Sequence, residues 1–199
     1  MKEPLVLASS SPFRRMLMEN AGLAFEAMPA AIDERALEQE FNQTPTSPSQ
    51  IALLLARAKA LDVSARQPGA IVIGSDQTMS LGDRVFHKPK SREDARDTLM
   101  ALSGKMHQLN SGLCLARDQH ILWEGVSSAR LHVRELSPPF IESYLDRVGD
   151  KVMSSVGAYQ LEGEGVQLFS AIEGDYFTIL GLPMLPLLEA LRNLGAIDG

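Results

Sequence analysis

Three hydroxyl side chains and two arginines lie within seven consecutive residues near the start of the chain. The run reads Ser9, Ser10, Ser11, Pro12, Phe13, Arg14 and Arg15. Ser11 is a preferred N-cap residue and Pro12 fits the first helical turn, so a helix is predicted to begin here with unpaired backbone N–H groups. Such a helix end attracts anions, and arginine offers a planar fork to phosphate oxygens. The run is therefore a candidate phosphate site, although a well-capped surface helix with solvated arginines explains it equally well.

An acidic residue, Asp76, follows closely on an apolar run rich in β-branched residues. Residues 70–74 are typical of a central strand with both faces buried, which is predicted to end at residues 75–78. A carboxylate at such a place either caps a helix or serves a site in the crevice beyond the sheet, as a proton acceptor or as a metal ligand. The sequence does not separate these two roles. Because Mg²⁺ needs few carboxylates besides substrate oxygens and water, Asp76 together with Glu34 or another acid would suffice to bind it.

Two lysines stand on or next to predicted elements. Lys88 stands beside Pro89, just after a hairpin predicted around Gly82 and Asp83. Lys59 lies on a helix predicted over residues 48–65, where a lysine that directs its ammonium group to solvent is the ordinary expectation. The four histidines show no metal-ligand spacing and are assigned no role.

Composition argues against several classes of protein. With 19 Lys and Arg against 25 Asp and Glu, the net charge of −6 argues against a general affinity for nucleic-acid polymers, so any anion must be bound locally. The one cysteine, Cys114, stands in an apolar run that favours a buried, inert thiol, and it cannot form a disulfide within the chain. No apolar run is long enough for a signal segment or a membrane span, so we expect no membrane partner and a reducing cytoplasm.

The elements that would position these residues alternate between strands and helices and then form a meander. Predicted strands cover residues 4–8, 25–28, 70–74, 79–81, 85–86, 108–116, 120–126, 129–134 and 166–172, with turns near Asp118 and Ser127. Predicted helices cover residues 12–21, 48–65, 91–104 and 138–148, and a last helix opened by residues 181–183 runs to Gly195, while residues 32–34 lead into polar turns. This order predicts an α/β fold: a mixed, twisted sheet flanked by helices, in two lobes whose polar strand ends open into a central cleft.

One segment, residues 157–165, is too rich in glycine for regular structure. It is predicted to form a loop whose backbone passes close to another group, and a ligand is one candidate for that group.

Five motifs in a fixed order connect the chain to a known family. They are Leu-Ala-Ser-x-Ser-Pro-x-Arg near the start, Gly-Ser-Asp-Gln after the central strand, Lys-Pro after the hairpin, Leu-Ser-Gly after a helix, and Gly-x-x-x-x-Glu-Gly before a Gly-Leu-Pro. In combination they resemble the Maf family of nucleoside triphosphate pyrophosphatases, from about Leu5 to Leu191. The resemblance implies a single domain over residues 1–199 with a fold like that of the inosine triphosphate pyrophosphatases, two lobes holding a nucleotide between them.

The activity implied by the resemblance is hydrolysis of a nucleoside triphosphate between the α and β phosphates, with the help of a divalent metal, Mg or Mn. Carried over residue by residue, it implies that Asp76 is the proton acceptor, while Glu34 is named as a possible metal ligand on the chemistry of Mg²⁺ alone. Arg14, Lys59 and Lys88 resemble the family's phosphate-contacting positions, and Ser9 and Ser11 would bond phosphate or cap the helix. A homodimer is suggested by the resemblance alone.

Three positions resemble those that distinguish bases within the family. Phe13, Gln77 and Glu162 resemble the branch that prefers 7-methyl-GTP, which has an aromatic residue, a glutamine and a glutamate at these positions. An aromatic face and a carboxylate would both favour a cationic methylated guanine. Phe13 replaces a tryptophan often found there, and Tyr159 echoes the branch that takes dTTP and UTP, which is the alternative substrate class. A nucleotide-binding regulator of septum formation is a second alternative. A nucleotidyltransferase is disfavoured, because the opening loop lacks the glycines such enzymes use against a triphosphate.

Overall fold

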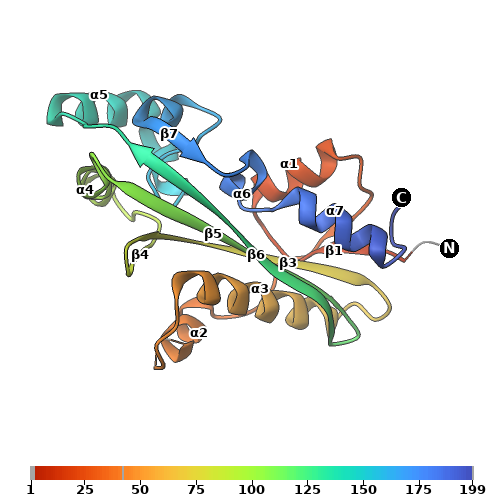
Figure 1. Cartoon of the computed structure of the whole chain (residues 1–199). Helices are drawn as coiled ribbons and strands as arrows, with labels where there is room; N and C mark the ends of the chain where they lie inside the picture. Colours follow the sequence, from red (N-terminus) through yellow and green to blue (C-terminus); the bar gives the residue numbers. More distant parts are fainter. Residues whose placement is uncertain (1–2, 42, 199) are drawn as a thin grey trace. The chain divides into compact units, whose positions relative to one another are not determined.

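A computed structural model of the chain, which describes residues 3–41 and 43–198, shows a mixed α/β fold (Figure 1). The helices are α1 (Pro12–Asn20), α2 (Glu34–Phe41), α3 (Pro48–Ser64), α4 (Arg92–Leu102), α5 (Pro138–Val148), α6 (Tyr176–Leu180) and α7 (Met184–Asn193), with 3₁₀ turns η1 (Gly149–Ser154) and η2 (Glu164–Leu168). The strands are β1 (Leu5–Leu7), β2 (Glu26–Ala27), β3 (Ile71–Leu81), β4 (Arg84–Phe86), β5 (Met106–Arg117), β6 (His120–Val133) and β7 (Phe169–Glu173). The predicted fold class, a mixed sheet flanked by helices, is confirmed.

The chain divides into two compact units. The first comprises residues 1–77, 110–127 and 176–199, and the second comprises residues 78–109 and 128–175. Strands β3, β5 and β6 each contribute a part to both units. The strand order of the first unit is β2-β1-β3-β5-β6, and in the second unit β4 pairs with β3 and β7 pairs with β6.

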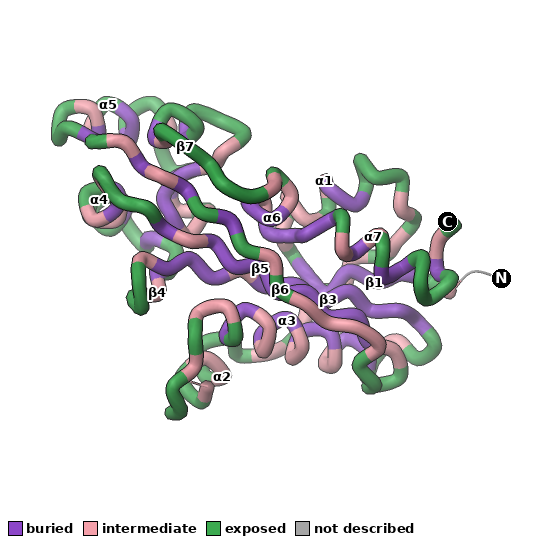
Figure 2. The backbone as a smooth tube through the Cα atoms, viewed as in Figure 1, coloured by how far each residue is buried: buried purple, intermediate pink, exposed green. Residues whose placement is uncertain are grey.

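The sheet of the first unit is covered by helices on both faces. Strand β1 runs parallel to β2 and to β3, with Leu7 opposite Ile73. On one face, alternate residues of β1 and β3 pack against α1 and α7, and on the other face the intervening residues pack against α3 (Figure 1). Both faces of β1 and β3 are apolar because both are covered, and the strands are buried throughout this part (Figure 2).

Local signals fix the ends of the helices in the first unit. Ser11 caps α1 through a hydrogen bond that its hydroxyl accepts from the backbone N–H of Arg14, as predicted. Ser47 and Gln50 form a reciprocal capping box at the start of α3, with a proline at its first turn. Both helices therefore begin within a residue of the predicted position.

The second unit combines short strands with α4 and α5. Strands β3 and β4 form the predicted hairpin, with Leu81 opposite Arg84. Strand β7 pairs antiparallel with β6, and its residues after Phe169 are exposed. Helix α5 spans the predicted residues 138–148, and Ser137 caps it.

Four predictions about the elements were wrong. The strand predicted over residues 166–172 begins only at Phe169, because the preceding residues form η2. Strand β3 does not end at residues 75–78 but continues to Leu81, since β5 adjoins it beyond the point where β1 stops. The turn predicted near Ser127 is absent, because β6 runs through it without a break. Residues 32–34 do not lead into turns only: Asp33 accepts hydrogen bonds from the backbone N–H groups of Arg35 and Ala36 and so starts α2.

The centre of β5 carries Cys114, which is fully buried on the α3 face. Burial raises the pKa of its thiol to about 12, and the nearby carboxylate of Glu124 acts in the same direction. The prediction of an inert thiol agrees with this environment.

Of the helices that the structure describes, none has the length and hydropathy needed to cross a membrane.

Candidate active site

Most of the predicted site residues lie in the first unit. These are Ser9, Ser11, Phe13, Arg14, Glu34, Lys59, Asp76 and Gln77. The other two, Lys88 and Glu162, belong to the second unit.

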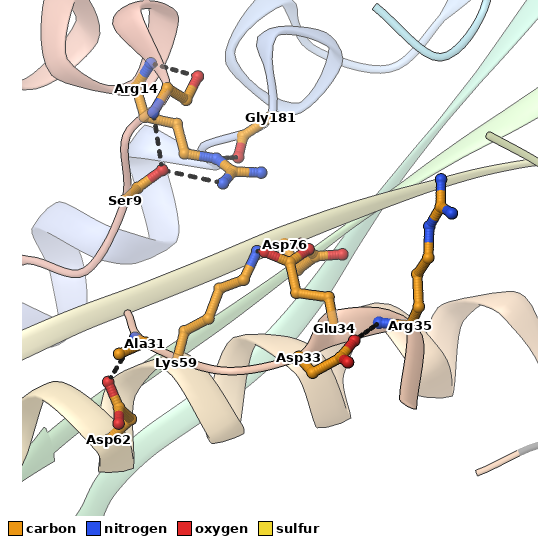
Figure 3. Close-up of polar contacts among 11 residues, drawn as sticks. Ser9, Arg14, Ala31, Asp33, Glu34, Arg35, Lys59, Asp62, Asp76 and Gly181 are labelled. Atoms are coloured by element: carbon orange, nitrogen blue, oxygen red, sulfur yellow. Dashed lines mark hydrogen bonds and ion pairs between the residues drawn. The ribbon is translucent and has the colours of Figure 1, made fainter. Parts of the chain in front are cut away.

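Asp76 belongs to a charged cluster in which Lys59 lies between Asp76 and Glu34 (Figure 3). The Lys59 Nζ lies 2.5 Å from Asp76 Oδ1 and 2.9 Å from Glu34 Oε1. Lys59 and Asp76 are buried, at 7% and 8% exposure, whereas the Glu34 side chain is about half exposed. The ordinary expectation of a solvent-directed Lys59 is therefore wrong, because its ammonium group is held between two carboxylates.

The position of Lys59 depends on the close packing of α3 against β3. A Cβ atom built on Gly74 would lie 2.2 Å from the backbone oxygen of Ala56 and 2.7 Å from the backbone nitrogen of Ala60. Only glycine permits this approach. It brings the helix turn that carries Lys59 against the strand that carries Asp76.

The turn between β1 and α1 is organised around the Ser9 hydroxyl and the Arg14 guanidinium (Figure 3). Ser9 Oγ accepts hydrogen bonds from the backbone N–H of Ser11, at 3.1 Å, and from an Nη of Arg14, at 3.2 Å. The Nε of Arg14 donates to the backbone carbonyl of Gly181, at 2.8 Å. Burial lowers the pKa of Arg14, and the carboxylates of Asp76 and Glu34 act in the opposite direction.

The turn and the acidic cluster come from adjacent parallel strands. Ser9 follows β1, whose Leu7 pairs with Ile73 of β3, and Asp76 lies three residues beyond Ile73. Arg14 is within electrostatic range of Asp76. The structure thus places a cationic, hydroxyl-rich turn beside a carboxylate cluster, which is the arrangement that binding of a metal-bound polyphosphate requires.

The Gly181 carbonyl is a shared acceptor that the sequence analysis assigned no role. Besides Arg14, the hydroxyl of Ser75 lies 2.9 Å from it and 2.9 Å from the carbonyl of Gly112, and the single hydroxyl hydrogen is shared between these two acceptors. Residue 181 has a φ of +93°, which glycine adopts without strain. Gly181 is the first residue of the Gly-Leu-Pro motif, but residue types alone do not predict that a backbone carbonyl accepts hydrogen bonds.

The side-chain amide of Gln77 is committed to the protein. Its Nε2 donates to the hydroxyl of Ser111, at 3.0 Å, and to the carbonyls of Thr178 and Ile179 in α6, at 2.9 and 3.1 Å. The predicted contact of Gln77 with a base is therefore limited to its Oε1 atom. Phe13 is half-buried on α1.

Lys88 lies on the wall of a surface pocket of about 390 Å³ in the second unit. The lining residues are Arg84, Val85, Phe86, His87, Lys88, Pro89, Lys90, Asp94, Asp97 and Thr98. The Arg84 guanidinium stacks over the Phe86 ring, 4.5 Å from its centroid. The pocket thus combines basic groups with two acidic ones.

The glycine-rich loop that carries Glu162 is packed around Tyr159. The Tyr159 hydroxyl lies 2.7 Å from His107 Nε2, and its ring meets Phe169 edge to face. A Cβ atom on Gly165 would lie 2.5 Å from the Gln160 carbonyl. The loop backbone was predicted to pass close to another group, and at Gly165 that group is the backbone of the loop itself. The Glu162 side chain is exposed.

The carboxylates present suit a magnesium or manganese ion that keeps water and phosphate ligands. Among the described residues, no group of three or more His, Cys, Asp or Glu side chains is placed to hold a metal. Glu34 and Asp76 nevertheless converge on one cation, the ammonium group of Lys59. Two carboxylates are a typical protein contribution for Mg²⁺ bound with a nucleotide.

Comparisons with known proteins agree with the motifs. The family model described as Maf-like protein matches residues 4–194. The 7-methyl-GTP pyrophosphatase of Rhizobium etli is 65% identical over 199 residues, covering 100% of both chains. The nucleoside triphosphate pyrophosphatase of Nitrobacter winogradskyi is 55% identical, covering 96% of this chain and 94% of the relative.

Among solved structures, a nucleoside-triphosphatase / dITP/XTP pyrophosphatase from Mycobacterium abscessus is similar at 14% identity and a TM-score of 0.42, covering 96% of this chain and 97% of that chain. The family model and the relatives extend over nearly every residue. The resemblance inferred from the motifs is thereby confirmed: the chain belongs to the Maf-like protein family.

Proposed function

We propose that this protein is a nucleoside triphosphate pyrophosphatase that hydrolyses the α–β phosphate bond of 7-methyl-GTP. The observation that carries the proposal is the buried Asp76 carboxylate, which pairs with the Lys59 ammonium group that also pairs with Glu34. Asp76 lies on β3, which is adjacent to the strand that precedes the Ser9–Arg14 turn. The relatives named 7-methyl-GTP pyrophosphatase, at 65% and 62% identity over the whole chain, support the substrate.

In the proposed reaction, Asp76 accepts a proton from the attacking water. The water oxygen forms a new bond to the α phosphorus. The bond between the α phosphorus and the bridging oxygen breaks, and diphosphate leaves with that electron pair. Arg14 offsets the negative charge that accumulates on the phosphate oxygens, and Lys88 is proposed to do the same. A divalent ion held by Glu34 and Asp76 would supply further charge neutralisation.

Base recognition is proposed to involve Phe13, Glu162 and the Oε1 atom of Gln77. The methylated guanine carries a positive charge on its imidazole ring, so the Phe13 ring and the Glu162 carboxylate would both attract it. Glu162 would also accept hydrogen bonds from guanine N1–H and the amino group. Tyr159 does not favour the pyrimidine alternative, because its hydroxyl is buried against His107.

The proposal is tested by incubating the purified protein with Mg²⁺ and a panel of 7-methyl-GTP, GTP, dTTP and UTP while diphosphate and monophosphate are measured. We expect equal amounts of the two products, and the highest kcat/KM for 7-methyl-GTP. Release of inorganic phosphate in place of diphosphate, or no turnover of any nucleotide, would contradict the proposed reaction. A preference for dTTP or UTP would retain the reaction and reject the base assignment.

We also propose that the enzyme acts in the cytoplasm as a homodimer. The buried free thiol of Cys114 is compatible with a reducing compartment. Light scattering coupled to gel filtration tests the oligomeric state, and a mass equal to one chain, 21.7 kDa, would reject it.

A further inference from the structure

We propose that Lys59 holds the place of the divalent cation in the metal-free enzyme and leaves that place when a metal ion binds. The inference deepens the proposed function and rests on it, since it assigns Lys59 a role in controlling access to the Glu34–Asp76 pair. The ammonium group is a resident counter-ion that exchanges with the metal.

The Lys59 Nζ atom contacts both carboxylates that would bind the metal ion. It lies 2.5 Å from Asp76 Oδ1 and 2.9 Å from Glu34 Oε1, at the point where the two carboxylates converge (Figure 3). Magnesium binds carboxylate oxygens at about 2.0–2.1 Å, so an ion shared by these two oxygens would occupy the space of the ammonium group. Two cations cannot share that space, and binding of one requires departure of the other.

Lys59 and Asp76 form a buried ion pair. Only 9% of the Lys59 side chain and 11% of the Asp76 side chain are accessible to solvent. Removing one partner of a buried ion pair leaves an uncompensated charge, which is strongly unfavourable. The Asp76 carboxylate therefore needs a cation at all times, and Lys59 supplies it when no metal is bound.

The lysine side chain is able to exchange one anionic partner for another. Its charge is compact and sits on a flexible four-carbon stem, so it can change partners by rotation about side-chain bonds without movement of α3. Once displaced, the ammonium group needs a new anion. The phosphates of the substrate supply one, so metal uptake would prepare Lys59 for the phosphate contact that the sequence analysis predicts.

Removal of Lys59 is expected to change the affinity for metal in the direction opposite to its effect on catalysis. If Lys59 only contacted phosphate, its removal would leave metal affinity in the absence of nucleotide unchanged. If Lys59 competes with the metal, its removal strengthens metal binding while it weakens catalysis.

The test is calorimetric titration of Mn²⁺ into the nucleotide-free protein, comparing wild type with Lys59→Met, Lys59→Arg and Arg35→Met. Lys59→Met removes the competing charge at similar side-chain length, whereas Lys59→Arg retains it. Arg35 is an exposed cation next to Glu34 in the sequence, so Arg35→Met removes the same charge without touching the cluster. We expect Lys59→Met to lower the Kd for Mn²⁺ by about tenfold or more, and the other two variants to change it by less than about threefold.

Thermal unfolding of the same variants provides a second readout. Without Lys59 the two carboxylates repel each other, so Lys59→Met should unfold at a lower temperature than wild type in chelator, and Mn²⁺ should raise its Tm by more. A Kd for Lys59→Met equal to or weaker than that of wild type, with no larger rise in Tm, would overturn the inference.

A measurement on the wild-type protein needs no variant that might alter folding. Lysine side chains labelled with ¹³C and ¹⁵N report their environment by NMR, and Lys59 is assigned by its absence from the Lys59→Arg spectrum. Added Mg²⁺ should shift the Lys59 Nζ and Cε resonances, whereas an unshifted signal at saturating metal would reject the exchange. None of these readouts uses turnover, so their failure is distinguishable from failure of the pyrophosphatase assay.

Discussion

The Nε of Arg14 donates to the backbone carbonyl of Gly181, 2.8 Å away, so a residue 167 positions later in the chain orients the arginine of the first turn. The guanidinium also donates to Ser9. These two bonds fix the plane of the fork, and a planar, fixed fork is what phosphate recognition requires.

Replacing Arg14 with lysine should therefore weaken substrate binding, even though the positive charge is kept. A lysine cannot bond Gly181, Ser9 and a phosphate in this geometry, and we expect kcat/KM to fall by about 10–100-fold. Arg15→Lys is the matched control, because the neighbouring Arg15 is exposed. Equal effects of the two substitutions would show that the geometry of Arg14 is unimportant.

Replacing Asp76 with asparagine removes the proposed proton acceptor. We expect kcat of the variant to fall by about 10²–10⁴-fold. The variant should still bind 7-methyl-GTP, and its slow turnover allows the Kd to be measured by calorimetry. Asp83→Asn, in the exposed turn between β3 and β4, should retain full activity. A change in KM alone would argue that Asp76 does not take part in the chemical step.

Glu162→Gln tests base recognition without disturbing the core. Glu162 is exposed, so the variant should fold as wild type does, and loss of its charge should lower kcat/KM for 7-methyl-GTP by about tenfold relative to GTP. Glu164→Gln is the control: Glu164 is also exposed in this region, but its carboxylate pairs with Arg147, at 2.7 Å. An unchanged ratio of the two substrates would show that Glu162 does not read the methylated base.

Two glycines of the same loop should respond differently to substitution by alanine. A Cβ atom at residue 165 would meet the Gln160 carbonyl at 2.5 Å, whereas one at residue 163 has its nearest neighbour at 3.8 Å. We expect Gly165→Ala to lower the free energy of unfolding by about 1–3 kcal/mol and Gly163→Ala to change it little. Urea denaturation measures both, and equal stability of the two variants would contradict the packing described here.

His107 should make the stability of the protein depend on pH. The ring is fully buried, and burial lowers its pKa to about 4, with a smaller contribution from His132. The unfolded chain takes up a proton at this histidine below about pH 6.5, whereas the folded protein does so only below about pH 4. The free energy of unfolding therefore decreases as the pH falls through this window, by up to roughly 3 kcal/mol from this group.

The histidine effect is measured by denaturation of wild type and His107→Gln at pH 7 and pH 5. Carboxylates titrate in both proteins, so the difference between the two pH dependences reports His107. A wild-type protein that loses no more stability than His107→Gln would exclude this role.

The sequence predicted the elements with strong local signals and missed those set by tertiary contacts. Helix α5 begins where Ser137 precedes two prolines, so its bounds follow from local chemistry. Strand β3, by contrast, continues past Asp76 because β5 and β4 pair with it there, and no local pattern reports pairing with distant strands. Polar residues at 75–78 predict a strand end, whereas in the structure they are site and scaffold residues within the strand.

The candidate site was predictable in its side-chain types but not in its contacts. Asp76, Glu34 and Arg14 were named from chemistry and motif, and the structure places their charges within range of one another. The burial of Lys59 was not predictable, because it depends on the close approach of α3 at Gly74. The chemical roles assigned to all the site residues, Lys88 and Glu162 included, stay predictions.

The shielded thiol of Cys114 makes the molecule suitable for site-specific fluorescent labelling. With one cysteine in the chain and a thiol pKa near 12, a maleimide dye at neutral pH would leave the native residue unmodified. A pair of surface cysteines, one introduced into each unit, would then carry donor and acceptor dyes on an otherwise unaltered background.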